Sequence, residues 1–369
     1  MSKNSNSLTK LALQKFKKNF WGVLSFSFIV LCAFIVVFAY LFTPDDTKNA
    51  NQMHLSIHSK KPGFSVQMLT IPSTEKKEES FLSTLFFGKE NTATEIPIAN
   101  YRIKNNQLFI TEYTDDAVAG IEKEIPLNSF PTLTEASKIP TEFMQQKTFY
   151  FGTDKYGRDV LSRMLIGMRI SFTIGFVAVF ISLLIGISLG ALAGYFEGKA
   201  DAIIMWIINV TWSIPTLLLV IAITLTLGKG FWQVFVAVGL TMWVEVARIV
   251  RGQVLSAKRM QYVTAARALG YNDFRIIVKH ILPNIMAPVI VISAANFAAA
   301  ILIESGLSFL GIGAQPPMPS WGAMIKDHYS YIILGKPYLA IIPGLAIMSL
   351  VMAFMLIGNA LRDALDVKN

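Results

Sequence analysis

The sequence has little charge, four histidines and a single cysteine. Because Cys32 is alone, the chain can form neither an internal disulfide nor a cluster of thiolate ligands for a metal. Only 15% of its 369 residues are Asp, Glu, Lys or Arg, whereas a soluble domain carries about 25%. Hydrophobic residues make up 53% and the mean hydropathy is +0.50, so the polar residues cannot cover the surface of a soluble protein of this length. We therefore expect a protein that crosses a membrane several times.

Common motifs of catalytic and cofactor sites are missing as well. No Gly-Lys pair is followed by Ser or Thr, so the chain has no ATP-binding P-loop of that kind, and no histidine is followed by Glu, as the zinc-protease pattern requires. His54 and His58 have no third ligand nearby in the sequence, which favours ordinary surface histidines over metal ligands. We predict no catalytic residue, no cofactor and no metal site.

Six apolar segments are candidates to cross a bilayer, which takes about 20 residues of helix. The last five contain no Asp, Glu, Lys or Arg, so an ion-driven transporter with ionisable groups at mid-membrane is disfavoured. Four acids, Glu197, Asp201, Glu245 and Glu304, fall at their ends. The sequence predicts an all-α bundle of six transmembrane helices. The segments are residues 20–42, 170–195, 202–227, 231–244, 285–303 and 339–357.

The basic residues predict the orientation of these spans. Residues 1–19, which contain five lysines, precede the first span, and the loop 248–282 contains seven basic residues with Asp273 as its one acid. Both should be cytoplasmic, and six crossings then place the C-terminus inside too. Such anchoring also accounts for the net charge of +9, so no nucleic acid partner is expected.

Residues 43–150 differ from the rest, with 14 acidic and 11 basic side chains. We expect this segment to be an extracytoplasmic insertion, and β-rich, because two pairs of strand-like runs flank turn residues. One pair, 53–58 and 64–69, flanks 60–63; the other, 101–104 and 108–113, flanks Asn105-Asn106. A disordered loop is the alternative.

Two further patterns concern helix packing. Gly186, Gly190 and Gly194 recur every four residues, which predicts close approach of another helix. Residues 260–283 predict two short amphipathic helices, with apolar stripes that must be covered, separated by Gly270. Asn272 is the predicted N-cap of the second, and Pro283 the turn into the next span. The stripes can lie on the bundle or on lipid headgroups, or can dock into a groove of a partner.

Residues 262–270, followed by 275–277 and 280–284, resemble the coupling loop of ABC importer permeases. Thr264 stands where that family usually has Glu, while Ala265, Ala266 and Gly270 fit the family pattern. The resemblance implies contact with ATPase subunits, with Arg267 and Arg275 at the rim. Its candidate residues are Tyr262, Thr264, Ala265, Ala266, Arg267, Gly270, Arg275 and Pro283.

Other blocks resemble the second permease of dipeptide and oligopeptide importers. The similarity is loose over 19–40 and close over 151–366. Taken singly, each block can also be a rigid outer turn or a solvated helix end. The family-motif residues of the outer segments are Gly152, Asp154, Arg158, Asp159, Glu304, Gly311, Gln315, Pro316, Trp321 and Gly322.

The resemblance implies a permease subunit of the bacterial inner membrane that is not itself an enzyme. Expected partners are a second permease in a heterodimer, two ATP-binding subunits, an extracytoplasmic substrate-binding protein and membrane lipid. Expected substrates are di- or oligopeptides, with nickel chelates as another family cargo. A membrane-anchored sensor or structural protein, with an outer ligand-binding domain, is the alternative from another class.

Overall fold

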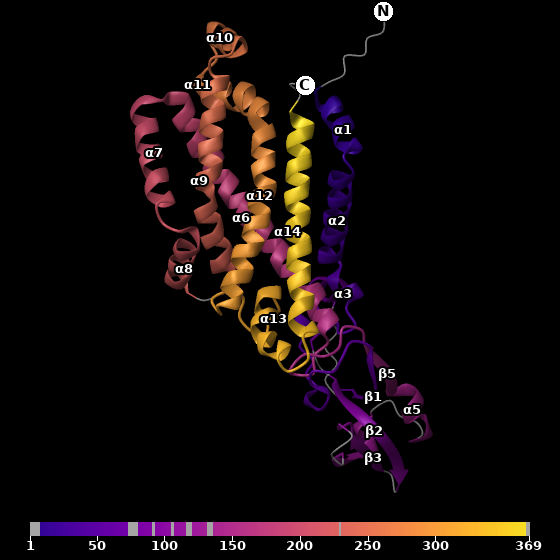
Figure 1. Cartoon of the computed structure of the whole chain (residues 1–369). Coiled ribbons are helices and arrows are strands. Elements are labelled where there is room, and N and C mark those ends of the chain that lie inside the picture. The colour runs from indigo at the N-terminus through magenta and orange to yellow at the C-terminus, as the bar shows by residue number, and fades with distance from the viewer. Residues whose placement is uncertain are drawn as a thin grey trace, which may run out of the picture.

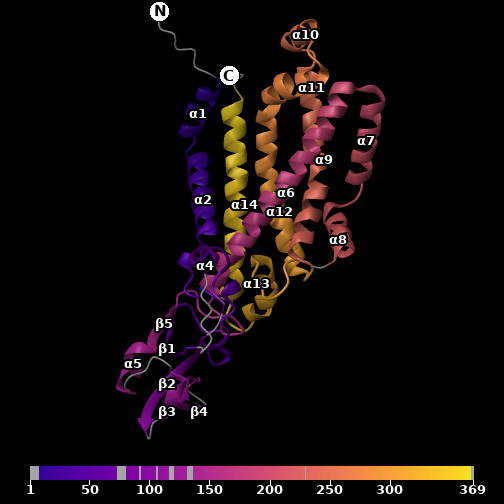
Figure 2. The ribbon, with the colours of Figure 1, turned by 180° about the vertical axis from the view of Figure 1, so that it is seen from behind.

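A computed structural model describes residues 8–72, 80–90, 93–104, 107–115, 120–130, 136–228 and 230–366. It consists of a bundle of long helices and a small β-sheet at one end of that bundle (Figure 1). Helices α1 (Leu8–Lys18) and α10 (Gln261–Ala268) and the end of α14 lie at the opposite end, and the reverse view agrees (Figure 2).

Within the described residues, five helices are long and apolar enough to cross a membrane, or six if one bent pair counts as a span. These segments are helical because a helix pairs its backbone hydrogen-bonding groups internally, and their apolar side chains can face lipid. The five are α2 (Phe20–Val37), α6 (Val160–Phe196), α9 (Phe231–Ala257), the continuous path Asp273–Phe309 that ends in α12 (Met286–Phe309), and α14 (Tyr338–Leu365).

The span predicted over 202–227 is broken into two helices. Helix α7 (Gly198–Trp212) and helix α8 (Thr216–Leu227) meet at an angle of 91°. Pro215 lies in the break, has no N–H to donate and disfavours a helical conformation of the residue before it. The predicted segment therefore counts as a sixth span only if the bent pair is taken as one, and hydropathy alone does not register the break.

Two other spans extend beyond their predicted ends. Helix α6 begins at Val160, not near residue 170, and α9 continues to Ala257, well past residue 244. Glu245, which was expected at the end of the apolar segment 231–244, consequently lies in the middle of helix α9. The reason is that a helix can continue through polar residues beyond its apolar part. The length of an apolar segment is therefore a lower limit for the length of the helix that contains it.

The glycine series of α6 packs against α9, as predicted. A Cβ added at Gly186 would lie 2.5 Å from Cβ of Val246, and one at Gly194 would lie 2.7 Å from the carbonyl oxygen of Arg251. One at Gly190 would overlap the carbonyl oxygen of Ala247. The two backbones can be this close only because the glycines have no side chain.

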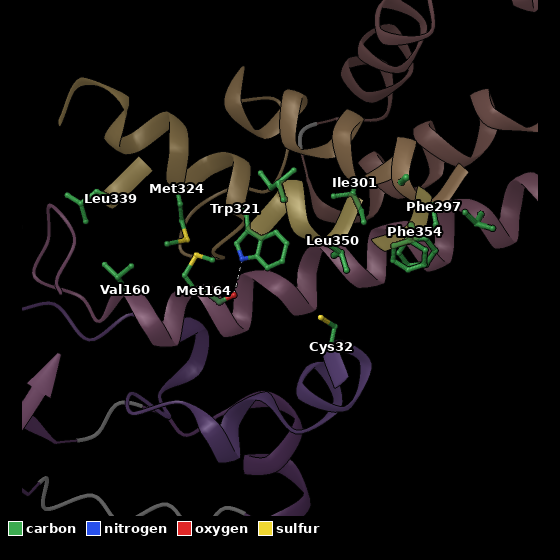
Figure 3. Close-up of a cluster of buried hydrophobic side chains, with 13 residues drawn as sticks. Cys32, Val160, Met164, Phe297, Ile301, Trp321, Met324, Leu339, Leu350 and Phe354 are labelled. Carbon is green, nitrogen blue, oxygen red and sulfur yellow. Dashed lines mark hydrogen bonds between the residues drawn. The ribbon is translucent and has the colours of Figure 1, made fainter. Parts of the chain in front are cut away.

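A cluster of buried apolar side chains joins α6, α12, α13 (Trp321–His328) and α14 (Figure 3). Trp321 is almost fully buried, and its Nε1 donates a hydrogen bond to the carbonyl oxygen of Met164, at 2.9 Å. Phe297 and Phe354 stack with their ring centroids 4.0 Å apart. Cys32 of α2 is buried at the edge of this cluster as a free thiol.

The five-stranded antiparallel sheet has the order β4-β3-β2-β1-β5. The predicted hairpin 101–113 is confirmed by the pairing of β2 with β3, although its turn, Asn105-Asn106, lies outside the described residues. The strands are β1 (Phe64–Ile71), β2 (Thr94–Lys104), β3 (Gln107–Glu112), β4 (Glu122–Pro126) and β5 (Met144–Phe149). Two short helices, α4 (Phe81–Phe87) and α5 (Ile139–Glu142), accompany them.

The other predicted hairpin, around residues 60–63, was wrong. Leu55–Ile57 form a short 3-10 helix, and the edge of β1 is paired with β5 instead. The backbone of this segment is hydrogen-bonded to the loop before α6, where Ser59 N donates to the carbonyl oxygen of Asp154. Long-range pairing therefore outweighed the local strand pattern.

Candidate functional site

The turn after α10 forms as its local sequence predicts. Gly270 has φ +77°, and the N–H groups of Gly270 and Tyr271 donate to the carbonyl oxygens of Arg267 and Ala266. This is the Schellman arrangement that ends a helix with a left-handed glycine. The Asn272 side chain then accepts a hydrogen bond from Arg275 N at 2.9 Å, which confirms the predicted N-cap.

The predicted second amphipathic helix is not a separate element. Helix α11 (Asp273–Arg275) continues into a π-helix, Ile276–Ile281, and a 3-10 turn, Leu282–Ile285, which lead into α12. Pro283 lies inside this continuous helical path, so the prediction that the chain turns there between two separate helices was wrong. The path continues because the wider π-turn and the 3-10 turn accommodate a proline that lacks an N–H.

The chain itself covers only part of the predicted apolar stripes. Val263 and Ala266 are buried in a cluster with Ile276, Ile277 and Ile281. By contrast, Tyr262, Leu269 and Phe274 are 39%, 72% and 74% exposed. Thr264 and Ala265 are also exposed on α10. We call Tyr262, Leu269 and Phe274 the inner apolar residues. They belong to α10, to its C-cap and to α11, and these two helices lie at the end of the bundle far from the sheet (Figure 1).

The two arginines expected at the rim also hold this region together. The Arg267 guanidinium lies 5.4 Å from the ring centroid of Tyr195, and that of Arg275 lies 4.1 Å from the ring of Tyr271. The Tyr195 hydroxyl donates to Asp273 at 2.6 Å. These contacts fasten the α10 turn and α11 to the end of α6.

At the other end of the bundle, the predicted outer residues around Asp154 organise the start of α6. The buried Asp154 carboxylate accepts hydrogen bonds from the backbone of Arg158 at 3.0 Å and from its Nε at 2.7 Å. Asp159 caps α6 by accepting from Ser162 N at 2.8 Å. Gly152 and Gly157 both have positive φ, and a Cβ on Gly157 would overlap the backbone of His54.

The remaining outer residues connect α12 with α13. Glu304 is fully buried and accepts hydrogen bonds from Ser308 at 2.7 Å and Ser171 at 3.3 Å. Gly322 packs so closely on Ser305 that a Cβ there would overlap its carbonyl oxygen, and Gln315 Nε2 donates to the carbonyl oxygens of Gly311 and Gly313.

The two outer groups meet at one cavity. It has a volume of about 380 Å³ and is lined by Arg158, Arg163, Pro316 and Asp327, among others. The contacts of Asp154, Asp159, Glu304 and Trp321 position helices, and none of them forms a catalytic pair.

His54 is buried, so the expectation of an ordinary surface histidine was wrong for this residue. Within the described residues, no group of three His, Cys, Asp or Glu side chains is arranged to hold a metal ion. His54 Nε2 instead lies 3.5 Å from a Glu95 oxygen, and Lys147 Nζ lies 2.8 Å from the same oxygen. Burial raises the pKa of Glu95, but the hydrogen bond with His54 and the charge of Lys147 outweigh it and lower the pKa to about 2.

One hydrolase-like pattern does occur in the sequence. Residues 186–190 read Gly-Ile-Ser-Leu-Gly, the order of a nucleophile elbow, which requires a sharp turn between a strand and a helix. Here Ser188 lies within α6, and its hydroxyl donates to the carbonyl oxygen of Leu184 at 2.7 Å. A serine bonded along a continuous helix is not an activated nucleophile.

Sequence reasoning missed a polar group at the middle of the bundle. Glu245 of α9 and Trp212 at the end of α7 line two adjoining cavities, and Arg248 lines one of them. The sequence signal that could have indicated this group is a lone carboxylate, Glu245, directly after an apolar run and followed three residues later by Arg248. Its meaning depended on how far α9 extends.

Comparison with known proteins identifies the chain's family. Residues 186–368 match the family described as binding-protein-dependent transport system inner membrane component. The chain is also 45% identical over 219 residues to the glutathione transport system permease protein GsiD of Pectobacterium atrosepticum, covering 59% of this chain and 72% of that protein. The chain belongs to this family. The permease is likewise 45% identical to the dipeptide transport system permease protein DppC of Bacillus subtilis, over 59% of this chain and 68% of that protein.

Among solved structures, an inward-facing form of the MetNI methionine ABC transporter matches with a TM-score of 0.47 and 18% identity. That match covers 56% of the permease and 97% of the compared chain, and it adds nothing to the assignment at this level of similarity. Family membership makes the protein a multi-pass membrane permease subunit of an ABC importer, with ATP hydrolysis on separate subunits.

Proposed function

We propose that the permease forms half of a pore for di- or oligopeptides, in a heterodimer with a second permease. Two relatives that are 45% identical bear the names of glutathione and dipeptide transport systems, which supports a peptide-like substrate. An extracytoplasmic binding protein would deliver this substrate, and two ATP-binding subunits would drive its passage. The sensor alternative has no support once the family is known.

The proposed orientation places α10 and both termini in the cytoplasm, and residues 43–150 outside. Helix α1, α10 and the end of α14 lie at one end of the bundle, and the sheet lies at the other, which supports it (Figures 1 and 2). The basic residues between the end of α9 and α12, from Lys258 to Lys279, assign this end of the bundle to the cytoplasm by the positive-inside rule. On this arrangement, the sheet domain is available to the binding protein or to the outer face of the second permease.

The single observation that carries the proposed coupling is the exposure of the inner apolar residues. Tyr262, Leu269 and Phe274 are exposed on α10, its C-cap and α11, and exposed side chains of this kind are typical anchors for a groove in a partner. Their backbone is fixed by the Gly270 turn and by the Tyr195 contacts. We propose that α10 docks onto an ATP-binding subunit and that Thr264 and Ala265 lie at this contact.

The test is the substitution Gly270→Val. Among the described residues, no atom lies within 4 Å of a Cβ added there, so a clash inside the permease is not expected. The positive φ is expected to cost about 1–3 kcal/mol with any β-branched residue, and the cost is relieved by reshaping the turn. The inner apolar residues would then be displaced from their positions in the partner's groove. Since about 1.4 kcal/mol corresponds to a factor of ten, the affinity for the ATP-binding subunit should fall by about tenfold or more.

We expect ATP-dependent uptake and substrate-stimulated ATP hydrolysis to fall together while membrane insertion stays normal. Thr264→Ala is the milder variant at the same contact, and Gly252→Ala is the matched glycine control because it has open space on α9. Undiminished uptake and ATPase coupling in a normally assembled Gly270→Val transporter would rule out the coupling role.

A further inference from the structure

Glu245 occupies an unusual place for a carboxylate. It is the fifteenth residue of the 27-residue helix α9, about 20 Å from the outer end of that helix at 1.5 Å per residue. It is exposed although both of its neighbours, Val244 and Val246, are buried. No other described residue donates a hydrogen bond to it or forms an ion pair with it. A charge at this depth is costly in lipid and faces a water-filled path or a partner.

Two cavities adjoin at this carboxylate. One, of about 160 Å³, lies between α7, α8, α9 and α12 and includes Thr216 and Thr241. The other, of about 220 Å³, includes Arg248, Ile249 and Ile292. Trp212 and Glu245 line both cavities, so they mark the junction. Trp212 reaches this place because α7 ends there, at the break before α8.

Arg248 follows Glu245 by one helical turn and is held in place. Its guanidinium lies 3.6 Å from the ring centroid of Trp212, and its Nη2 donates to Asn209 Oδ1 at 3.1 Å. Its Nε is buried and has no hydrogen-bond partner within the described part of the chain. A guanidinium that is held by its neighbours and has an unused donor can donate hydrogen bonds to the oxygen of a ligand.

Together these groups match a short peptide with free ends. Residues three apart on a helix have their Cβ atoms about 5–6 Å apart, and an extended dipeptide spans at most about 7 Å. A carboxylate suits the peptide's ammonium group, and a guanidinium suits its carboxylate. Beside these two charged groups, the walls of the second cavity are apolar and are formed by Trp212, Val244, Ile249 and Ile292.

From this arrangement, and on the basis of the proposed function, we propose that Glu245, Arg248 and Trp212 form a half-way binding site for zwitterionic peptides. Glu245 binds the free amino end and Arg248 binds the free carboxylate. The site recognises the two ends that all short peptides share and leaves side-chain selection to the binding protein. A peptide released from that protein would pause here before passing to the cytoplasmic side.

The test measures binding to the assembled transporter, both permeases with the ATP-binding subunits, in nanodiscs without the binding protein. The probe is radiolabelled alanyl-alanine, and the competitors are N-acetyl-alanyl-alanine and alanyl-alanine amide. The wild type should bind each blocked peptide at least about tenfold more weakly than alanyl-alanine, the effect of losing one charge-assisted contact.

Two variants separate the roles of the two ends. Glu245→Gln should abolish discrimination against the N-acetyl peptide and keep discrimination against the amide. Arg248→Lys keeps the charge but loses the fork-shaped donors, so it should weaken discrimination against the amide alone. Glu142→Gln, an exposed site in α5, is the matched control and should change neither.

Several results would overturn this proposal. They are equal binding of all three peptides by the wild type, no binding of alanyl-alanine at millimolar concentration, and unchanged discrimination in Glu245→Gln. Glu245→Gln could also prevent assembly with the second permease. If the fraction that still assembles discriminates against the N-acetyl peptide as the wild type does, Glu245 pairs with that subunit and not with the peptide. The proposed function fails by a different result, namely the absence of ATP-dependent peptide uptake by the wild-type transporter.

Discussion

The contact between α6 and α9 gives the sharpest test of how this bundle is held together. We predict that Gly190→Ala destabilises the permease, whereas Gly252→Ala does not. A Cβ at Gly190 would overlap the carbonyl oxygen of Ala247 and lie 2.9 Å from Cβ of Val250. Ordinary contacts between such atoms are near 3.5–4.0 Å, so the two backbones must separate by about 1 Å.

The magnitude follows from two opposing effects. Overpacking a tight interface costs about 1–3 kcal/mol, while replacing Gly by Ala inside a helix returns up to about 1 kcal/mol. Gly190→Ala should therefore lower the free energy of unfolding by about 1 kcal/mol. Gly252 lies on α9 with no described atom within 4 Å of an added Cβ, so only the favourable helix effect remains there. The two variants should differ by about 2 kcal/mol.

The assay is reversible unfolding of the isolated permease in mixed micelles, followed by tryptophan fluorescence. Testing the isolated chain removes any effect of partner subunits on Gly252. If Gly190→Ala were as stable as Gly252→Ala, the close approach of α6 and α9 would not be a source of stability, and the packing argument would be refuted.

Two further predictions address orientation and the outer sheet. With Cys32 first replaced, Ser80→Cys should be labelled by an impermeant thiol reagent in cells with a permeable outer layer, and Ser256→Cys should not; the opposite pattern would invert the proposed orientation. Because the pKa of Glu95 is lowered to about 2, its ion pairs stabilise the fold fully above its ordinary pKa, near 4.3, and this stability should be lost as the pH falls from there towards 2. Glu95→Gln should remove this pH dependence and lower the free energy of unfolding by on the order of 2 kcal/mol at neutral pH, as measured by thermal unfolding. A Glu95→Gln protein that is as sensitive to acid as the wild type would contradict the role of the His54–Glu95–Lys147 contacts.

The features that the sequence predicted correctly are those with local causes. Gly270 and Asn272 each specify their own backbone geometry, so the α10 turn and the following cap could be predicted residue by residue. The glycine series of α6 could be predicted for the same reason, because spacing alone places Gly186, Gly190 and Gly194 on one face.

The features that were missed depend on contacts between distant parts of the chain. Residues 53–58 have a strand-like pattern, but their backbone is engaged by the loop before α6 and the edge of β1 is occupied by β5. Glu245 could not be placed in the middle of a helix without knowing that α9 continues to Ala257. The apolar stripes were expected to need a cover, but which side chains remain exposed depends on how the π-helix turns beneath α10.

The unbroken helical path from Asp273 to Phe309 would give the proposed coupling a long lever arm. Its 37 residues span about 55 Å, with the α10 turn at one tip and the buried Glu304 near the other. If the tip near Glu304 acts as the fulcrum, a tilt of about 5° moves the α10 tip by about 5 Å, roughly one helical turn. The π-helix Ile276–Ile281, near the end that would move, has a wider hydrogen-bond pattern than the rest of the path. It is therefore the segment that would deform first under a partner's motion, before the helix near Glu304 does.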